Sequence, residues 1–141
     1  MTPVNSLAYP VLCLARDNSV SVARTPTELQ ACNAVAWFRN RYFDDLRLFD
    51  AGGSSYRVSS AELARPLYGW RRFIARLLNQ RLTVALEVER AGSPSLDAAK
   101  QATIEWIHRA PGFWEAAHDL PELESLVRRS PNMEALCAIF E

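Results

Sequence analysis

Histidine is rare in this chain of 141 residues, which contains two. Enzymes that act at neutral pH usually recruit His, Cys or carboxylates with a shifted pKa. The serines within residues 54–60 lack the G-x-S-x-G context of a hydrolase nucleophile, and both glycine-rich phosphate-binding motifs are missing. No acid–base group therefore stands in a recognisable catalytic setting, and we expect a non-catalytic protein that uses no cofactor.

Both histidines occur in one local pattern, in which a glutamate precedes the histidine by three residues. The pairs are Glu105 with His108 and Glu115 with His118. On a helix this spacing places both side chains on one face, and two such pairs can contribute to a di-metal carboxylate site. Such a site takes its pairs from two long facing helices, whereas a proline–glycine break separates these two. We therefore expect no metal site.

Charge of either sign is not in excess, because 16 Lys and Arg balance 16 Asp and Glu. A dedicated nucleic-acid binder is usually basic, so this composition does not favour nucleic acid as the partner. Lysine is nearly absent, since Lys100 is the only one. A preference for arginine is typical of GC-rich bacterial genomes, and we expect a bacterial protein.

Cysteines and long apolar runs are also scarce. The three cysteines, at positions 13, 32 and 137, form no C-x-x-C or Cys/His pair with zinc-ligand spacing, and their odd number suggests no disulfide framework. No run approaches the roughly 20 apolar residues of a membrane span, and the first residues lack the basic start of a signal peptide. We expect reduced thiols, a cytoplasmic location and no membrane association.

Residues 81–90 carry the clearest structural signal, a strict alternation of apolar and other residues. The apolar positions are Leu82, Val84, Leu86 and Val88. This pattern predicts a half-buried strand, with Glu87 and Glu89 on its outer face. Apolar residues at helical spacing before and after this strand predict two helices, which we expect to pack on the strand.

Turn and capping signals divide the rest of the chain. They predict hairpins from residues 11–15 with 20–23 and from residues 46–50 with 55–58, with Gly52 and Gly53 supplying positive φ in the second loop. They also predict helices over 26–38, 66–80 and 95–110, a connector or short helical turn over 60–65, and three short helices from residue 113 onwards. The expected helix starts are Thr25, Ser93 to Ser95, Asp119 and Ser130, and Asp50 is expected to stabilise its turn.

This order predicts an α+β fold, with a mainly antiparallel sheet of about five strands, helices packed on one face, and a helical C-terminal third. We expect a single domain over residues 1–141, in which residues 95–141 form a helical extension of the same core.

Arginines and aromatic residues are interleaved within residues 65–81. Helical spacing places Trp70 and Phe73 on the buried side and the arginines on the solvent side. Nucleic-acid stacking platforms combine these residue types. With the aromatics buried, however, the pattern indicates a solvated helix whose arginines pair with nearby acids such as Glu62, Glu87 and Glu89. The candidate partner-binding residues are Arg65, Arg72, Arg76, Glu87 and Glu89.

Two classes of function remain open. In overall layout the chain resembles small bacterial inhibitor and immunity proteins, although no motif carries the likeness, and we expect a non-catalytic protein-binding domain of that type. The alternative is a small-molecule-binding protein or enzyme with an aromatic pocket between sheet and helices. Candidate lining residues are Trp37, Tyr42, Tyr56, Trp70, Trp106 and Trp114. A homodimer through a sheet face or edge is a further expectation.

Overall fold

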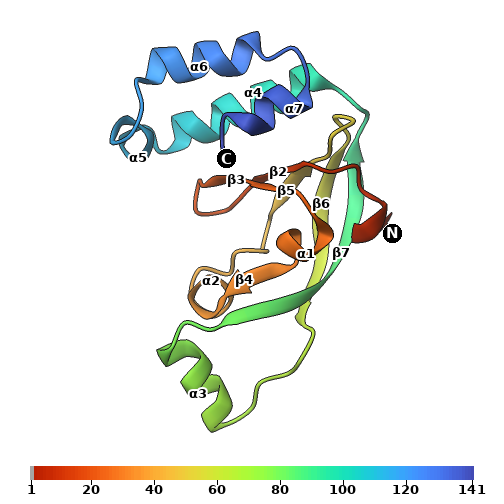
Figure 1. The fold of residues 1–141 in the computed structure, drawn as a ribbon, viewed down its shortest axis with the longest axis vertical. Coiled ribbons are helices and arrows are strands. Elements are labelled where there is room, and N and C mark those ends of the chain that lie inside the picture. Colours follow the sequence, from red (N-terminus) through yellow and green to blue (C-terminus); the bar gives the residue numbers. More distant parts are fainter. Residues whose placement is uncertain (1) are drawn as a thin grey trace.

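The computed structural model describes residues 2–141, which form a bent antiparallel sheet with helices at one end and a projecting helix at the other (Figure 1). The strands are β1 (Thr2–Pro3), β2 (Val11–Leu14), β3 (Val20–Ala23), β4 (Ala31–Asn33), β5 (Arg47–Phe49), β6 (Ser55–Leu63) and β7 (Arg81–Gly92). The helices are the 3-10 helix η1 (Val4–Ser6) and α1 (Pro26–Leu29), α2 (Ala34–Phe38), α3 (Trp70–Leu77), α4 (Leu96–Arg109), α5 (Pro111–Glu115), α6 (Leu120–Arg129) and α7 (Met133–Ala138).

The sheet runs in the order β1-β7-β6-β5-β2-β3, and β4 also pairs with β7. The predicted α+β class, the antiparallel sheet and the helical C-terminal third are confirmed. The described residues form seven strands instead of about five. The two unpredicted strands, β1 and β4, have two and three residues, so they are too short to show alternation.

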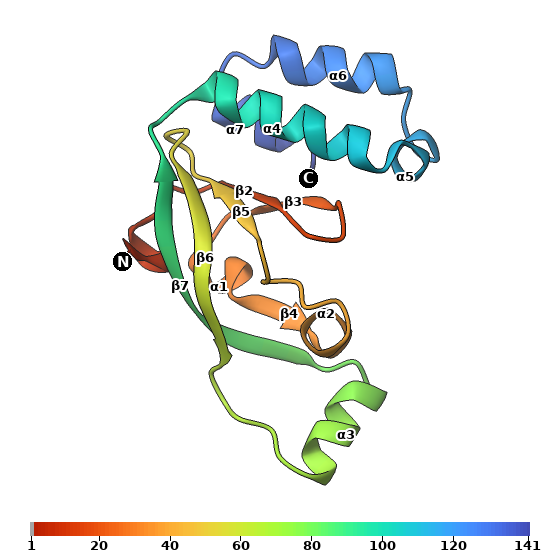
Figure 2. The same cartoon turned by 180° about the vertical axis from the view of Figure 1, so that it is seen from behind.

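Strand β7 has the predicted alternation, with Leu82, Val84, Leu86 and Val88 buried and Glu87 and Glu89 exposed. The prediction that two helices lie on this strand is wrong. Val84, Leu86 and Val88 pack in one core with Val4, Leu7 and Leu29, which precede β7 by more than 50 residues. The sheet is bent, and α1 and β4 lie on its concave side, whereas the N-terminus lies beside β7 (Figures 1 and 2).

Strand β2 is buried on both faces and so serves two cores. Val11 and Cys13 point into the first core, whereas Leu12 and Leu14 point into a second core formed with α4 to α7. This division follows from the two-residue period of a strand. The Trp106 indole Nε1 of α4 donates a hydrogen bond to the Ala15 carbonyl oxygen at 2.7 Å, which fixes the helical layer to the end of β2.

The single helix predicted over residues 26–38 is wrong, because β4 divides it into α1 and α2. Thr25 caps α1 as predicted, accepting a hydrogen bond from the Glu28 amide at 3.1 Å. Asn33 then caps a new helix by accepting one from the Ala36 amide at 2.8 Å. Backbone pairing between β4 and β7 competes with helix propagation here, and Asn33 is the sequence signal of the restart.

Two further predictions around the long hairpin need correction. Residues 60–63 are not a connector but the continuation of β6, which pairs with β7 from Ser55 opposite Gly92 to Leu63 opposite Val84. In the β5–β6 loop only Gly53 takes a positive φ, of 83°. The Asp50 carboxylate stabilises this loop as predicted, since it accepts hydrogen bonds from the Gly52 and Ser54 amides, both at 3.0 Å.

Three of the four C-terminal helices, α4, α6 and α7, begin at residues whose side chains cap the helix. Ser95 caps α4 and Asp119 caps α6, as predicted, while Asn132 rather than Ser130 caps α7. Trp114 in α5 is buried in the second core, but its neighbour Phe113 is exposed.

Across residues 2–141, no helix combines the length and apolar character needed to cross a bilayer.

Candidate functional site

Residues 64–80, which join β6 to β7 and include α3, form an arm that projects from the end of the sheet opposite the C-terminal helices (Figures 1 and 2). Gly69 precedes α3 with a φ of 58°, a conformation that glycine adopts without strain. The C-terminal end of the arm is fixed to α2. The Val35 amide donates to Asn79 Oδ1 at 2.9 Å, and the Ala34 amide donates to the Gln80 carbonyl oxygen at 2.8 Å.

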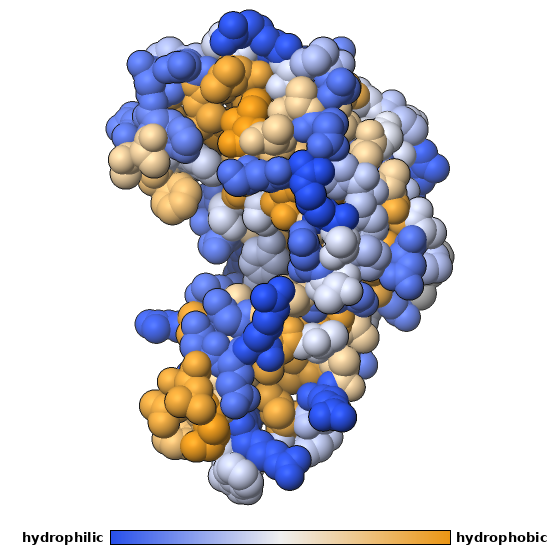
Figure 3. Space-filling model, viewed as in Figure 1, coloured by the Kyte–Doolittle hydropathy of each residue, from blue (hydrophilic) through white to orange (hydrophobic). Residues whose placement is uncertain are grey.

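The predicted helix over 66–80 is shorter than expected, and its predicted buried side is wrong. Trp70 is 71% exposed and Phe73 is 63% exposed, whereas the only buried residue of α3 is Ala75. We call the exposed apolar side chains of the arm the arm face. They are Tyr68, Trp70, Phe73, Leu77 and Leu78. In Figure 3 strongly apolar surface gathers over the end of the molecule that α3 occupies.

Positive charge surrounds the arm face. Residues 63–86 contain no Asp or Glu, and their basic residues are Arg65, Arg71, Arg72, Arg76 and Arg81. Within residues 2–141, none of the ion pairs includes one of these arginines. The predicted pairing with Glu62, Glu87 and Glu89 is therefore not formed. Guanidinium groups in this arrangement keep their donors free for carboxylates or phosphates from outside the chain.

Phe38 of α2 holds two of these arginines in place. The guanidinium carbon of Arg72 lies 4.8 Å from the centre of the Phe38 ring, and that of Arg76 lies 5.8 Å from it. A guanidinium stacked on an aromatic face is stabilised by the ring quadrupole, by about 0.5–1 kcal/mol at an exposed site. Stacking also restricts the side chain and leaves its edge donors available for hydrogen bonds.

A groove separates α2 from α3. It has a volume of about 390 Å³ and is lined by Ala34, Val35, Phe38, Arg39, Phe73, Arg76 and Leu77. Small residues of α2 and large residues of the arm face thus border one mainly apolar concavity, to which two arginines contribute their charge. An apolar concavity with polar groups beside it is the usual form of a binding site.

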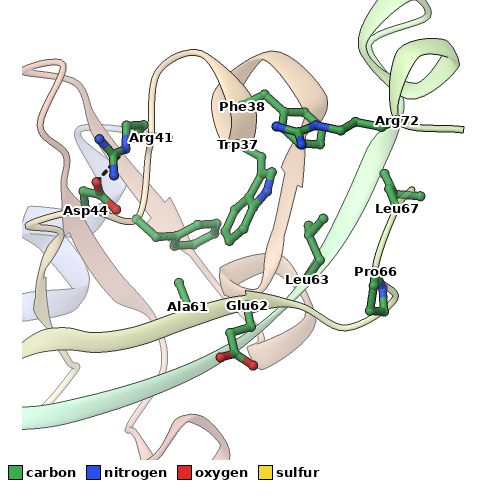
Figure 4. A pocket seen from close by; sticks show the side chains of 11 residues that line it. Trp37, Phe38, Arg41, Asp44, Ala61, Glu62, Leu63, Pro66, Leu67 and Arg72 are labelled. Carbon is green, nitrogen blue, oxygen red and sulfur yellow. Dashed lines mark ion pairs between the residues drawn. The ribbon is translucent and has the colours of Figure 1, made fainter. Parts of the chain in front are cut away.

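A second cleft lies on the other side of Phe38, between α2, the end of β6 and the start of the arm (Figure 4). Its volume is about 610 Å³. The apolar lining is Trp37, Phe38, Phe43, Ala61, Leu63, Pro66 and Leu67. The rings of Trp37 and Phe43 have centroids 6.1 Å apart with a 55° tilt, so together they form a fixed aromatic wall.

The polar groups of this cleft are few and partly paired. Arg41 Nε lies 3.0 Å from Asp44 Oδ2, and Arg41 takes a φ of 50° that brings this ion pair to the edge of the cleft (Figure 4). Glu62 and Arg72 complete the polar lining. This set contains charged groups but no histidine or thiol, so it suits the binding of an apolar or aromatic group better than acid–base chemistry.

The structure separates the five candidate partner-binding residues that the sequence indicated. Arg72 and Arg76 lie together on Phe38. Arg65 is exposed in the connector before α3. Glu87 and Glu89 are exposed on β7 beyond Arg81, and six strand residues span about 20 Å. The two glutamates therefore do not belong to the arm site.

Within the described residues, the two histidines and the buried cysteines do not form a catalytic or metal-binding site. His108 of α4 pairs with Glu124 of α6, and His118 lies beside the Trp114 ring with centroids 6.1 Å apart. No cluster of three or more metal-binding side chains exists within residues 2–141. Burial raises the pKa of the Cys13 thiol to about 12 and that of Cys32 to about 11, so both stay protonated at neutral pH.

The aromatic residues predicted to line one pocket are scattered. Trp37 lines the cleft of Figure 4, whereas Trp70 lies on the arm face and Trp106 and Tyr56 are buried in different cores. Sequence reasoning missed Phe38 and its two arginines as a group. The available signal was the acid-free stretch 63–86, which indicates a basic surface whichever way the helix faces.

Comparisons of this chain with protein-family models, with curated proteins and with solved structures found no match. A functional assignment must therefore come from the surface that the chain itself presents. That surface has two features of a binding site: the exposed arm face with its arginines, and the two concavities on either side of Phe38.

Proposed function

We propose that this chain is a non-catalytic protein-binding domain and that the arm is its binding element. The observation that carries the proposal is the exposure of the arm face beside arginines that form no ion pair with an acid within residues 2–141. Contiguous apolar side chains of this kind mark interaction surfaces on soluble proteins. Trp, Tyr and Arg are also the residue types that dominate the binding energy of protein interfaces.

Energetics support the same proposal. Moving a large apolar side chain fully out of water contributes about 1.5–3 kcal/mol, and α3 leaves most of this contribution unrealised at Trp70 and Phe73. A docking partner would recover it, because each ring could enter a desolvated contact. An inhibitor or immunity role, in which a small chain covers the surface of another protein, fits a projecting arm of this composition.

A second candidate function is small-molecule binding in the cleft of Figure 4. A volume of about 610 Å³ falls within the range of small-ligand sites, and the wall formed by Trp37 and Phe43 would suit a planar ligand. A panel of metabolites tests this candidate. A ligand that raises the melting temperature of the wild type but not of Trp37→Ala supports it, and the absence of any such ligand rejects it.

The protein-binding proposal is tested by co-purification from the native host. Tagged wild type should recover a second chain at fixed stoichiometry, and the double variant Trp70→Ala/Phe73→Ala should lose that chain. The matched control is Phe113→Ala/Leu126→Ala, which removes two exposed apolar side chains of the C-terminal helices. Recovery of the wild type alone, or equal recovery with both double variants, would overturn the proposal.

A further inference from the structure

The arm offers side chains rather than a strand edge to a partner. Residues 70–77 of the arm are helical, and a helix has no strand edge, so a partner cannot add a strand there. What the arm presents instead is a groove between two helices, with Trp70, Phe73 and Leu77 at the spacing of one helical face. Seven residues of α3 rise by about 10 Å, which matches two turns of a second helix.

Charge restricts the chemistry of that partner. The arm carries only arginine charges, and Arg72 and Arg76 are held on the Phe38 ring without a carboxylate partner in the described part of the chain. Opposite charge across an interface guides encounter and rejects wrong partners. A guanidinium that is held by stacking is suited to receive a carboxylate on its fixed donors.

The same charge argues against a symmetric dimer through this face. In an isologous contact, each residue of the patch meets the same patch on the second copy. The arginines of one arm would then lie against those of the other, and like charges in a partly desolvated contact destabilise it. The expected homodimer, if formed, would need another surface.

We infer that the partner of the arm is an acidic amphipathic helix, whose apolar ridge lies in the groove between α2 and α3 and whose flanking carboxylates pair with Arg72 and Arg76. This inference depends on the proposed protein-binding function and adds the chemistry of the partner to it. Apolar contacts with Phe73 and Leu77 supply affinity, and the two ion pairs set the orientation of the helix.

The first step of the test places a photo-crosslinking phenylalanine analogue at Tyr68, at the edge of the arm face, in the native host. Mass spectrometry of the nuclease-treated product identifies the cross-linked segment. We expect a protein segment with apolar residues at helical spacing and Asp or Glu beside them. Cross-linking only to a second copy, to lipid or to nucleic acid, or to a segment without acids, overturns the inference.

The second step uses the cross-linked segment as a synthetic peptide with the purified chain, and intrinsic tryptophan fluorescence, to which the exposed Trp70 contributes, reports binding. We expect Arg72→Gln/Arg76→Gln to weaken binding at least about tenfold and to reduce its dependence on salt between 50 and 300 mM NaCl. The matched control, Arg128→Gln/Arg129→Gln on α6, should leave the affinity unchanged. Equal affinity of wild type and the arm arginine variant overturns the inference.

The two proposals fail in distinguishable ways. If Trp70→Ala/Phe73→Ala abolishes capture while the arginine variant binds as the wild type does, protein binding by the arm stands and the acidic-helix inference falls. If neither variant changes capture, both fall. Sedimentation with phosphatidylglycerol vesicles, but no protein cross-link, would replace the protein partner with an anionic membrane surface.

Discussion

Replacing Phe73 by alanine should cost little stability, and the same replacement at Phe49 should cost much. Phe73 is 63% exposed, so folding removes roughly a third of it from water, whereas Phe49 is 1% exposed. A third of a side chain of about 200 Å² corresponds to about 70 Å², or nearly 2 kcal/mol at about 25 cal/mol per Å² as an upper bound. The higher helix propensity of alanine offsets about 0.5 kcal/mol of this loss.

We therefore expect Phe73→Ala to lower the free energy of unfolding by about 1 kcal/mol. Phe49→Ala should lower it by about 3–5 kcal/mol, because it also leaves a cavity between the sheet and α4 to α7. Urea denaturation followed by tryptophan fluorescence measures both values under the same conditions. Equal losses for the two variants would refute the reasoning, because α3 would then be packed into a core and would not present a binding surface.

Three further predictions concern the scaffold. Gly53→Ala should destabilise the chain by on the order of 1–3 kcal/mol in thermal unfolding, because residue 53 has a φ of 83° and the added Cβ would lie 3.2 Å from the Ser95 nitrogen. The control Gly112→Ala, whose added Cβ meets open space, should change the stability little. Equal effects of the two substitutions would contradict this prediction. His108→Ala should cost less than about 1 kcal/mol, since the His108 side chain in the pair with Glu124 is 57% exposed. A loss above about 2 kcal/mol in urea denaturation would contradict this. The free energy of unfolding should fall above about pH 9, because thiols of the unfolded chain ionise there. In the folded chain, burial raises the pKa of Cys13 to about 12 and that of Cys137 to about 11, so the stabilisation is complete below about pH 8 and is lost as the pH rises. A free energy of unfolding that rises between about pH 9 and 11 would contradict this prediction.

Sequence pattern predicted the parts of this fold that depend on local chemistry. The alternation of Val84, Leu86 and Val88 predicted a half-buried strand, and Ser95 and Asp119 predicted helix starts, because strand faces and caps are local properties. Residues that cover a strand come from elsewhere in the chain. No local signal indicated that Val4 and Leu29, rather than α3, would cover β7.

Sequence spacing also could not predict whether the apolar face of α3 is buried or exposed. The spacing of Trp70, Phe73 and Leu77 correctly predicted that they share one face of a helix, but the same spacing occurs in a core-facing helix and in a docking helix. Only the bend of the sheet, which leaves α3 beyond both cores, distinguishes the two. Phe38 could not be placed with Arg72 and Arg76, because β4 interrupts the helix to which the sequence assigned it.

The most direct test of the central claim is hydroxyl-radical footprinting of the arm face, performed on the isolated chain and inside the native host. In isolation, Trp70 and Phe73 should be oxidised rapidly, as their exposure requires. In the host their oxidation should slow several-fold relative to Phe113, which is 64% exposed and lies on α5 outside the arm. Oxidation of Trp70 and Phe73 at the same rate, relative to Phe113, in both settings would contradict the claim that a partner covers this arm.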